Sequence, residues 1–180
     1  MAPDEVEEAV AELVPSGRVN AVELAHPEFG AIRLIVVPRD STRAAERVWH
    51  HDLRRELARA RRRGWPLTVG AIAIDAGAST RGAAAAWANV LREEDSLAAH
   101  EDGAYLAILP DCSAEAAAAV AERIRAATPA PATVSIGFTA WVAGEDLESV
   151  VTRALGALAE ARHAGSNQVV IAPAHASASG

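Results

Sequence analysis

An almost uninterrupted apolar run, PLTVGAIAID, occupies residues Pro66–Asp75 and limits the folds open to this chain. The run is bounded by proline and aspartate, and its length is typical of a buried strand. We interpret it as the central strand of a sheet. Helical patterns stand on both sides of it in the sequence, so the chain is expected to form an α/β domain.

The other segments alternate between helical and β patterns. Apolar spacing and capping residues predict helices at Ser41–Arg63, Thr80–Glu94, Ser113–Ala127 and Glu145–Ala164. Apolar runs between turn residues predict strands at Leu97–Ala99, Tyr105–Leu109, Ala132–Trp141 and Gln168–Ala172. The turn HEDG joins the first two of these strands into a hairpin, which forces an antiparallel pair into the sheet. The expected fold is therefore a mixed sheet flanked by helices.

A separate pattern precedes this domain. Residues Pro3–Val14 have the apolar spacing of a helix, and Val19–Ala25 and Ala31–Val37 predict a β-hairpin. We assign residues 1–38 to an N-terminal helix and hairpin appendage, 39–172 to the main domain and 173–180 to a disordered tail. The hairpin is expected to pack on the domain or to extend its sheet, within one chain or in a dimer. The alternative is the remnant of a lost sensory domain.

Charge and cysteine content exclude several classes of protein. The formal net charge is −7, which argues against a general nucleic-acid binder, although all 17 cationic side chains are arginine. Cys112 is the only cysteine, so an internal disulfide, a CxxC zinc site and an iron–sulfur cluster are excluded. No apolar run approaches the roughly 20 residues that span a bilayer. The first turn is acidic, unlike that of a signal peptide, so we expect a cytoplasmic protein without membrane contact.

Five segments, in order, resemble one family. They are LRRELARARRRGWPL with the apolar strand after it, LREEDSLAAHEDGAYLAILP, AEAAAAVAERIRAA, TVSIGFTAW and ALGALAEARHAGSNQVV. Together they resemble the GGDEF domain, the diguanylate cyclase fold, over about Asp40 to Ala172. The resemblance implies a palm-like, ferredoxin-related βααββαβ sheet, which agrees with the order of elements predicted from the local patterns.

The residues at the family's signature positions do not suit its reaction. Joining two GTP molecules needs divalent metal held by carboxylates. By the resemblance, the five signature positions are Glu101, Asp102, Gly103, Ala104 and Tyr105. The metal-binding acid falls on Gly103 and the other metal aspartate on Ala73, unless the strand register slips to Asp75. We expect no cyclase activity and no cofactor. Glu101 and Asp102 are a solvated acidic turn or, alternatively, a reinvented metal site.

A second motif matches the family's inhibitory product site. Arg92-Glu93-Glu94-Asp95 is an RxxD sequence that is followed by five residues and then the signature, and the AERIR match adds Arg123. The resemblance implies that Arg92, Asp95 and Arg123 bind cyclic di-GMP. The planar guanidinium group can donate paired hydrogen bonds to guanine or phosphate, and the carboxylate accepts hydrogen bonds from the N–H groups of the guanine edge. The alternatives are a helix end with solvated charges, and a ligand-free module that dimerises or binds another signalling protein.

Three further candidates have simpler interpretations. The adjacent His50 and His51 point about 100° apart on a helix, so we expect surface histidines and no metal site. Cys112 has no basic neighbour in sequence and is expected to be an unreactive thiol. The arginine-rich face of Arg54–Arg63 is a solvated helix surface, a complement to the helix dipole, or a contact for nucleic acid or an acidic partner.

Overall fold

The computed structural model describes residues 22–26, 30–34, 42–75, 82–100 and 103–174. The predicted helix at Pro3–Val14 and most of the predicted tail lie outside these residues. The helices are α2 (Thr42–Arg63), α3 (Ala83–Ala88), α4 (Ala114–Ala127) and α5 (Leu147–His163). The strands are β1 (Val22–His26), β2 (Gly30–Leu34), β3 (Leu67–Ile74), β4 (Ser96–Ala99), β5 (Ala104–Pro110), β6 (Val134–Ala140) and β7 (Val169–Ala172).

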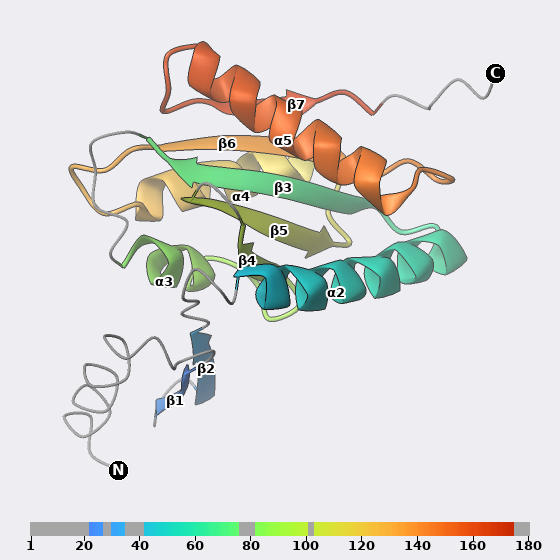
Figure 1. The fold of residues 1–180 in the computed structure, drawn as a ribbon, viewed down its shortest axis with the longest axis horizontal. Coiled ribbons are helices and arrows are strands. Elements are labelled where there is room, and N and C mark those ends of the chain that lie inside the picture. Colours follow the sequence, from blue (N-terminus) through green and yellow to red (C-terminus); the bar gives the residue numbers. More distant parts are fainter. Residues whose placement is uncertain (1–21, 27–29, 35–41, 76–81, 101–102, 175–180) are drawn as a thin grey trace.

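Five of these strands form one mixed sheet in the order β4-β5-β3-β6-β7 (Figure 1). The predicted central strand is confirmed, because β3 lies in the middle and all eight of its residues are buried. It pairs antiparallel with both β5 and β6. The predicted hairpin is the antiparallel pair β4–β5, and β6–β7 is the parallel pair.

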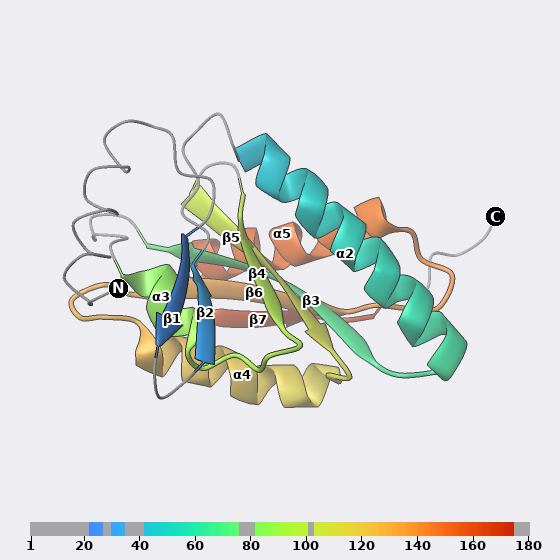
Figure 2. The same ribbon diagram turned by 90° about the horizontal axis from the view of Figure 1, so that it is seen from below.

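Helices cover both faces of this sheet, so the domain has two hydrophobic cores. Helices α2 and α5 lie on one face and α3 and α4 on the other, as Figures 1 and 2 show. The side chains of β3 alternate between the cores, as the period of a strand requires. Val69, Ala71 and Ala73 belong to the α2 and α5 core. Ile72 and Ile74 belong to the core under α3 and α4.

The predicted helix at Thr80–Glu94 is wrong in extent, since α3 covers only Ala83–Ala88. The Trp87 carbonyl accepts from the N–H groups of both Val90 and Leu91, which tightens the chain at the helix end. Polar residues then close a separate turn at Arg92–Asp95. Short polar side chains of this kind compete with helix formation by bonding to nearby backbone.

The other helix and strand predictions are confirmed with small shifts in their ends. Ser113 caps α4 by accepting from the Ala116 N–H at 3.2 Å. Helix α5 starts after Asp146, which caps it, and not at Glu145 as predicted. Strands β1 and β2 pair antiparallel, as expected for the N-terminal hairpin, while the domain boundaries stay a prediction. Within the described residues, no helix has both the length and the apolar character needed to cross a membrane.

Candidate functional site

The RxxD motif forms a closed turn between α3 and β4. The Arg92 N–H donates to Asp95 Oδ2 at 2.8 Å, and the Asp95 N–H donates to the Arg92 carbonyl at 3.1 Å. The Arg92 side chain is 54% exposed and lies 3.9 Å from a Glu94 carboxylate oxygen, so it is only loosely held. The turn is therefore rigid in its backbone and leaves the guanidinium free to contact a ligand.

Asp95 occupies an environment that disfavours its charge. Burial raises the pKa of this half-buried carboxyl group, while the Arg92 N–H and the Arg92 and Arg123 guanidinium groups act in the opposite direction. The net result is a raised pKa. A carboxylate in such a place costs the fold free energy unless another group bonds to it.

The third residue predicted to bind ligand comes from a different element than the RxxD turn. Arg123 lies on α4, and its charge acts on both Asp95 and the Cys112 thiol. Burial raises the pKa of Cys112, Asp95 raises it further, and Arg92 and Arg123 lower it. The RxxD turn and Arg123 stand on different elements, and a joint binding site for the three residues stays a prediction. The raised pKa also agrees with the unreactive thiol predicted for Cys112.

A groove of about 420 Å³ lies beside this turn. One side is formed by the RxxD turn and the start of β4, and the other by Asp52, Arg55 and Glu56 of α2. Arg123 is not among its lining residues. Sequence reasoning missed the α2 contribution because these residues stand about 40 positions before the motif, and no local pattern links them to it.

The signature positions lie in the β4–β5 hairpin. Glu101 and Asp102 fall outside the described residues. Gly103 has φ +74°, a turn conformation suited to glycine, and the His100 N–H donates to the Ala104 carbonyl at 2.8 Å. Ala104 of β5 pairs with Ala73 of β3. At this pair of positions the sheet therefore carries two methyl groups and no carboxylate. Within the described residues, no three His, Cys, Asp or Glu side chains are grouped to hold a metal ion.

Tyr105, the last signature position, is partly buried and packs against the core under α3 and α4. Its ring stands edge-on to Trp87, with centroids 5.4 Å apart, and burial raises the pKa of its hydroxyl. The Trp87 Nε1–H donates to Thr128 Oγ1 at 2.9 Å, which ties α3 to the end of α4. Tyr105 therefore contributes to the packing of α3 on the sheet.

Asp75, the alternative metal ligand, is engaged by the protein itself. Its carboxylate accepts from Ser135 Oγ at 2.6 Å, from Thr133 Oγ1 at 2.7 Å and from the Asn167 N–H at 2.9 Å. Burial alone would raise the pKa of Asp75, but these hydrogen bonds together hold it below the ordinary value. The geometry makes this side chain a structural link among β3, β6 and the turn before β7.

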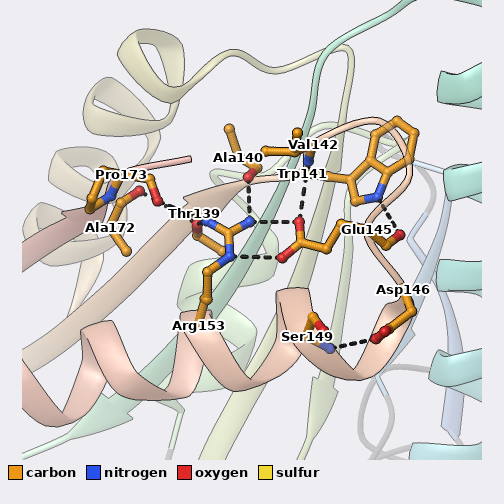
Figure 3. A network of polar contacts seen from close by, with 10 residues as sticks. All are labelled: Thr139, Ala140, Trp141, Val142, Glu145, Asp146, Ser149, Arg153, Ala172 and Pro173. Carbon is orange, nitrogen blue, oxygen red and sulfur yellow. Dashed lines mark hydrogen bonds and ion pairs between the residues drawn. The ribbon is translucent and has the colours of Figure 1, made fainter. Parts of the chain in front are cut away.

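A second polar network, shown in Figure 3, was not predicted from the sequence. Arg153 of α5 donates to both carboxylate oxygens of Glu145, at 2.8 and 2.7 Å, and also to Thr139 and to the carbonyls of Ala140 and Pro173. The Glu145 side chain is only 4% exposed. This network joins the ends of β6 and β7 to α5, and it is structural because the protein satisfies its groups.

Comparisons with known proteins give matches in structure but not in sequence. The sequence matches no protein-family model and no curated protein. The coiled coil and GGDEF domain of DgcB from Caulobacter crescentus, in complex with c-di-GMP, has a TM-score of 0.62 and 24% identity, over 70% of this chain and 80% of that one. Diguanylate cyclase SiaD from Pseudomonas aeruginosa, with its activator SiaC, has a TM-score of 0.66 and 22% identity, over 94% and 68%.

A third similar structure is the active GGEEF domain of a diguanylate cyclase from Vibrio cholerae. It has a TM-score of 0.62 and 22% identity, over 69% of this chain and 94% of that one. The shared feature is the mixed five-stranded sheet with helices on both faces. The chain thus has the fold of GGDEF domains, and the predicted palm-like architecture is confirmed.

Proposed function

We propose that this chain, which has the fold of GGDEF domains, is a catalytically inactive signalling protein that binds cyclic di-GMP. Its binding residues are Arg92 and Asp95 of the RxxD turn together with Arg123 of α4. The observation that carries the proposal is the closed RxxD turn, in which the Arg92 N–H donates to Asp95 Oδ2 at 2.8 Å while the Arg92 side chain stays 54% exposed beside a groove of about 420 Å³.

The chemistry of the three side chains suits this ligand. Two guanidinium groups supply planar donors for phosphate and for guanine, and a carboxylate supplies an acceptor for the N–H groups of the base edge. One Asp95 oxygen closes the turn by accepting from the Arg92 N–H. Within the described residues no donor is recorded for Oδ1, so this oxygen can accept from a ligand. A bound guanine would relieve the unfavourable burial of that charge.

The absence of catalysis is part of the same proposal. The positions that match the family's metal ligands are Ala73 and Gly103, which carry no coordinating side chain, and Asp75 is already bonded to three protein donors. Without carboxylates to hold divalent metal, the triphosphate charge is not neutralised and the 3′ hydroxyl is not activated. The protein would therefore bind cyclic di-GMP without synthesising it.

A second candidate function is a ligand-free module that dimerises or binds another signalling protein in the cytoplasm. The observation in its favour is the exposed arginine-rich face of α2, which no described helix or strand covers in Figure 2. One structural neighbour, SiaD, is solved with its protein activator. Failure of cyclic di-GMP to bind would favour this ligand-free module.

Titration calorimetry of the full chain with cyclic di-GMP tests the proposal, with cyclic di-AMP as the control nucleotide. We expect saturable heat with the guanine ligand only, and two ligand molecules per site if a stacked dimer forms. Absence of heat and of any melting shift at about 100 μM ligand, well above a micromolar Kd, would overturn it.

A further inference from the structure

The groove beside the RxxD turn has apolar side chains in its lining. It lies where β4 forms the edge of the sheet. Val48 of α2 lines it and is 62% exposed, and only one other large apolar side chain, Trp65, is exposed among the described residues. Leu91 and Leu97, which also line the groove, are partly buried. Apolar side chains gathered in a groove are typical of a binding surface.

Both walls of this groove are acidic. Asp52 and Glu56 stand on the α2 wall, and residues 93–95 on the opposite wall are all acids. Only two cations, Arg55 and Arg92, lie among these five acids, so the formal charge of the lining is −3. A groove of this sign attracts cations and repels nucleic acid and anionic membrane surfaces.

The protein itself compensates only part of this negative charge. Glu56 pairs with Arg59 at 3.2 Å, but within the described residues neither Asp52 nor Glu93 forms an ion pair. Burial raises the pKa of Asp95, the half-buried acid of the turn. A cation brought into the groove would therefore stabilise carboxylates that lack a partner or resist charging.

We propose that the groove binds a cationic amphipathic helix of a partner protein. The apolar stripe of that helix packs on Val48 and Leu97, and arginine or lysine side chains on each side of the stripe pair with the acids of the two walls. Asp52 and Glu56 are four positions apart on α2, which is about one turn, so they match partner cations with the same spacing. Docking of an amphipathic helix in a groove is a recurring mode of recognition.

This docking does not rest on nucleotide binding. Val48, Asp52 and Glu56 belong to α2, whereas the residues proposed to bind cyclic di-GMP belong to the RxxD turn and α4. Changes on the α2 wall therefore test the partner surface separately.

Fluorescence anisotropy of the full chain with a labelled peptide tests the proposal. The peptide has about 14 residues, roughly four helical turns, with leucines along one side and lysines on both flanks. One control peptide has glutamine in place of leucine, and another has glutamate in place of lysine. We expect each control to bind at least about tenfold more weakly. Equal binding of the leucine–lysine and glutamine–lysine peptides would overturn the proposal, because it would show only general attraction to a chain of net charge −7.

Substitutions on α2 locate the binding surface. Val48→Gln removes the exposed apolar contact and Asp52→Arg reverses a charge of the wall, and each should weaken the leucine–lysine peptide at least about fivefold. The controls are Ala58→Gln on the same helix and Glu160→Arg on α5, both at exposed positions outside the groove lining. Circular dichroism melting checks that all four variants fold. Equal affinity in the test and control variants would overturn the proposal.

The same samples separate this proposal from nucleotide binding. Calorimetry with cyclic di-GMP measures the nucleotide, and Val48→Gln should retain whatever heat the natural chain gives. Nucleotide binding without peptide binding would overturn the docking proposal alone, and the reverse would leave docking supported without the nucleotide. A natural chain that sediments as a dimer, with Val48→Gln as a monomer and no peptide bound, would overturn the partner helix and assign the groove to a second copy.

Discussion

The Asp75 carboxylate accepts a hydrogen bond from the backbone N–H of Asn167, 92 positions later in the chain, at 2.9 Å. The Asn167 backbone has φ +49°, and its side-chain oxygen accepts from Arg125 Nη2 at 3.1 Å. The end of β3 is thus joined to the turn before β7, and that turn is joined to α4. This link explains why an acid at the end of the central strand is part of the scaffold.

Replacing this acid should destabilise the fold. In Asp75→Asn the amide nitrogen cannot accept, so either Ser135 at one oxygen, or Thr133 and Asn167 at the other, lose their acceptor. A buried donor without an acceptor costs about 1–3 kcal/mol, and urea unfolding at pH 7 should show a loss of that size. An unchanged midpoint would mean that Asp75 is not bonded as described.

The same residue makes stability depend on pH. The pKa of Asp75 is lower in the folded state than its ordinary value of 3.8. Its contribution is therefore complete above pH 3.8 and is lost as the pH falls through the folded pKa. The free energy of unfolding, measured from pH 6 to about pH 2, should fall more steeply with decreasing pH for the natural chain than for Asp75→Asn. Parallel curves would contradict this.

Asp95→Asn should separate stability from ligand binding. Because burial raises the pKa of Asp95, its stabilising contribution is complete below pH 3.8 and is lost as the pH rises through the folded pKa. At pH 7 the variant should be at least as stable as the natural chain, since the asparagine oxygen can still accept from the Arg92 N–H. Cyclic di-GMP binding should weaken and become less selective for guanine. A lower melting temperature with unchanged binding would reverse both expectations.

Arg92→Ala should weaken cyclic di-GMP binding more than any other single change at the site. It removes a charge-assisted contact of about 1.5–3 kcal/mol, which is roughly 10-fold to 150-fold in Kd. Arg123→Ala should have a smaller effect if water screens its contact, and affinity should fall with rising salt. Calorimetry measures all three effects. Arg162→Ala, which removes an exposed arginine in the last turn of α5, is the control, and an equal loss there would indicate non-specific charge attraction.

Incubation with GTP and Mg²⁺ or Mn²⁺ should yield no cyclic dinucleotide. Ala73 and Gly103 offer no metal-binding atoms at the positions where the resemblance places them. Chromatography with mass detection checks the outcome, beside an active diguanylate cyclase as a positive control. Product above the no-protein background would revive Asp75 with Asp102 as metal ligands.

Gly137→Ala should destabilise the domain strongly. A Cβ at this position of β6 would overlap the backbone of Ala157 and Leu158 in α5, so the helix would have to move. Overpacking of this kind costs about 1–3 kcal/mol. Gly156→Ala is the matched control, because a Cβ there meets nothing within 4 Å, and it should stabilise α5 by about 0.5–1 kcal/mol. The midpoint temperature of thermal unfolding should fall for Gly137→Ala and rise for Gly156→Ala.

Much of the architecture could be predicted from short-range patterns. The apolar run at Pro66–Asp75 is the buried central strand β3, and Ser113 caps α4 as expected. The order of elements and the β4–β5 hairpin were also predictable, because periodicity and turn residues act over a few positions. The helix predicted over Thr80–Glu94 failed where local bonds at Arg92–Asp95 and at Trp87 ended it early.

The site was only partly visible in the sequence. The spacing of Arg92 and Asp95, with the resemblance that adds Arg123, was enough to name three residues. The sequence by itself therefore determined the elements, their order and the residue types at each position. Only the tertiary structure decided that Arg55 of α2 lines the groove beside the RxxD turn, and that Asp75 bonds to Asn167. Packing of the sheet and its helices brings such residues together, and the resulting contacts leave no periodic signal along the chain.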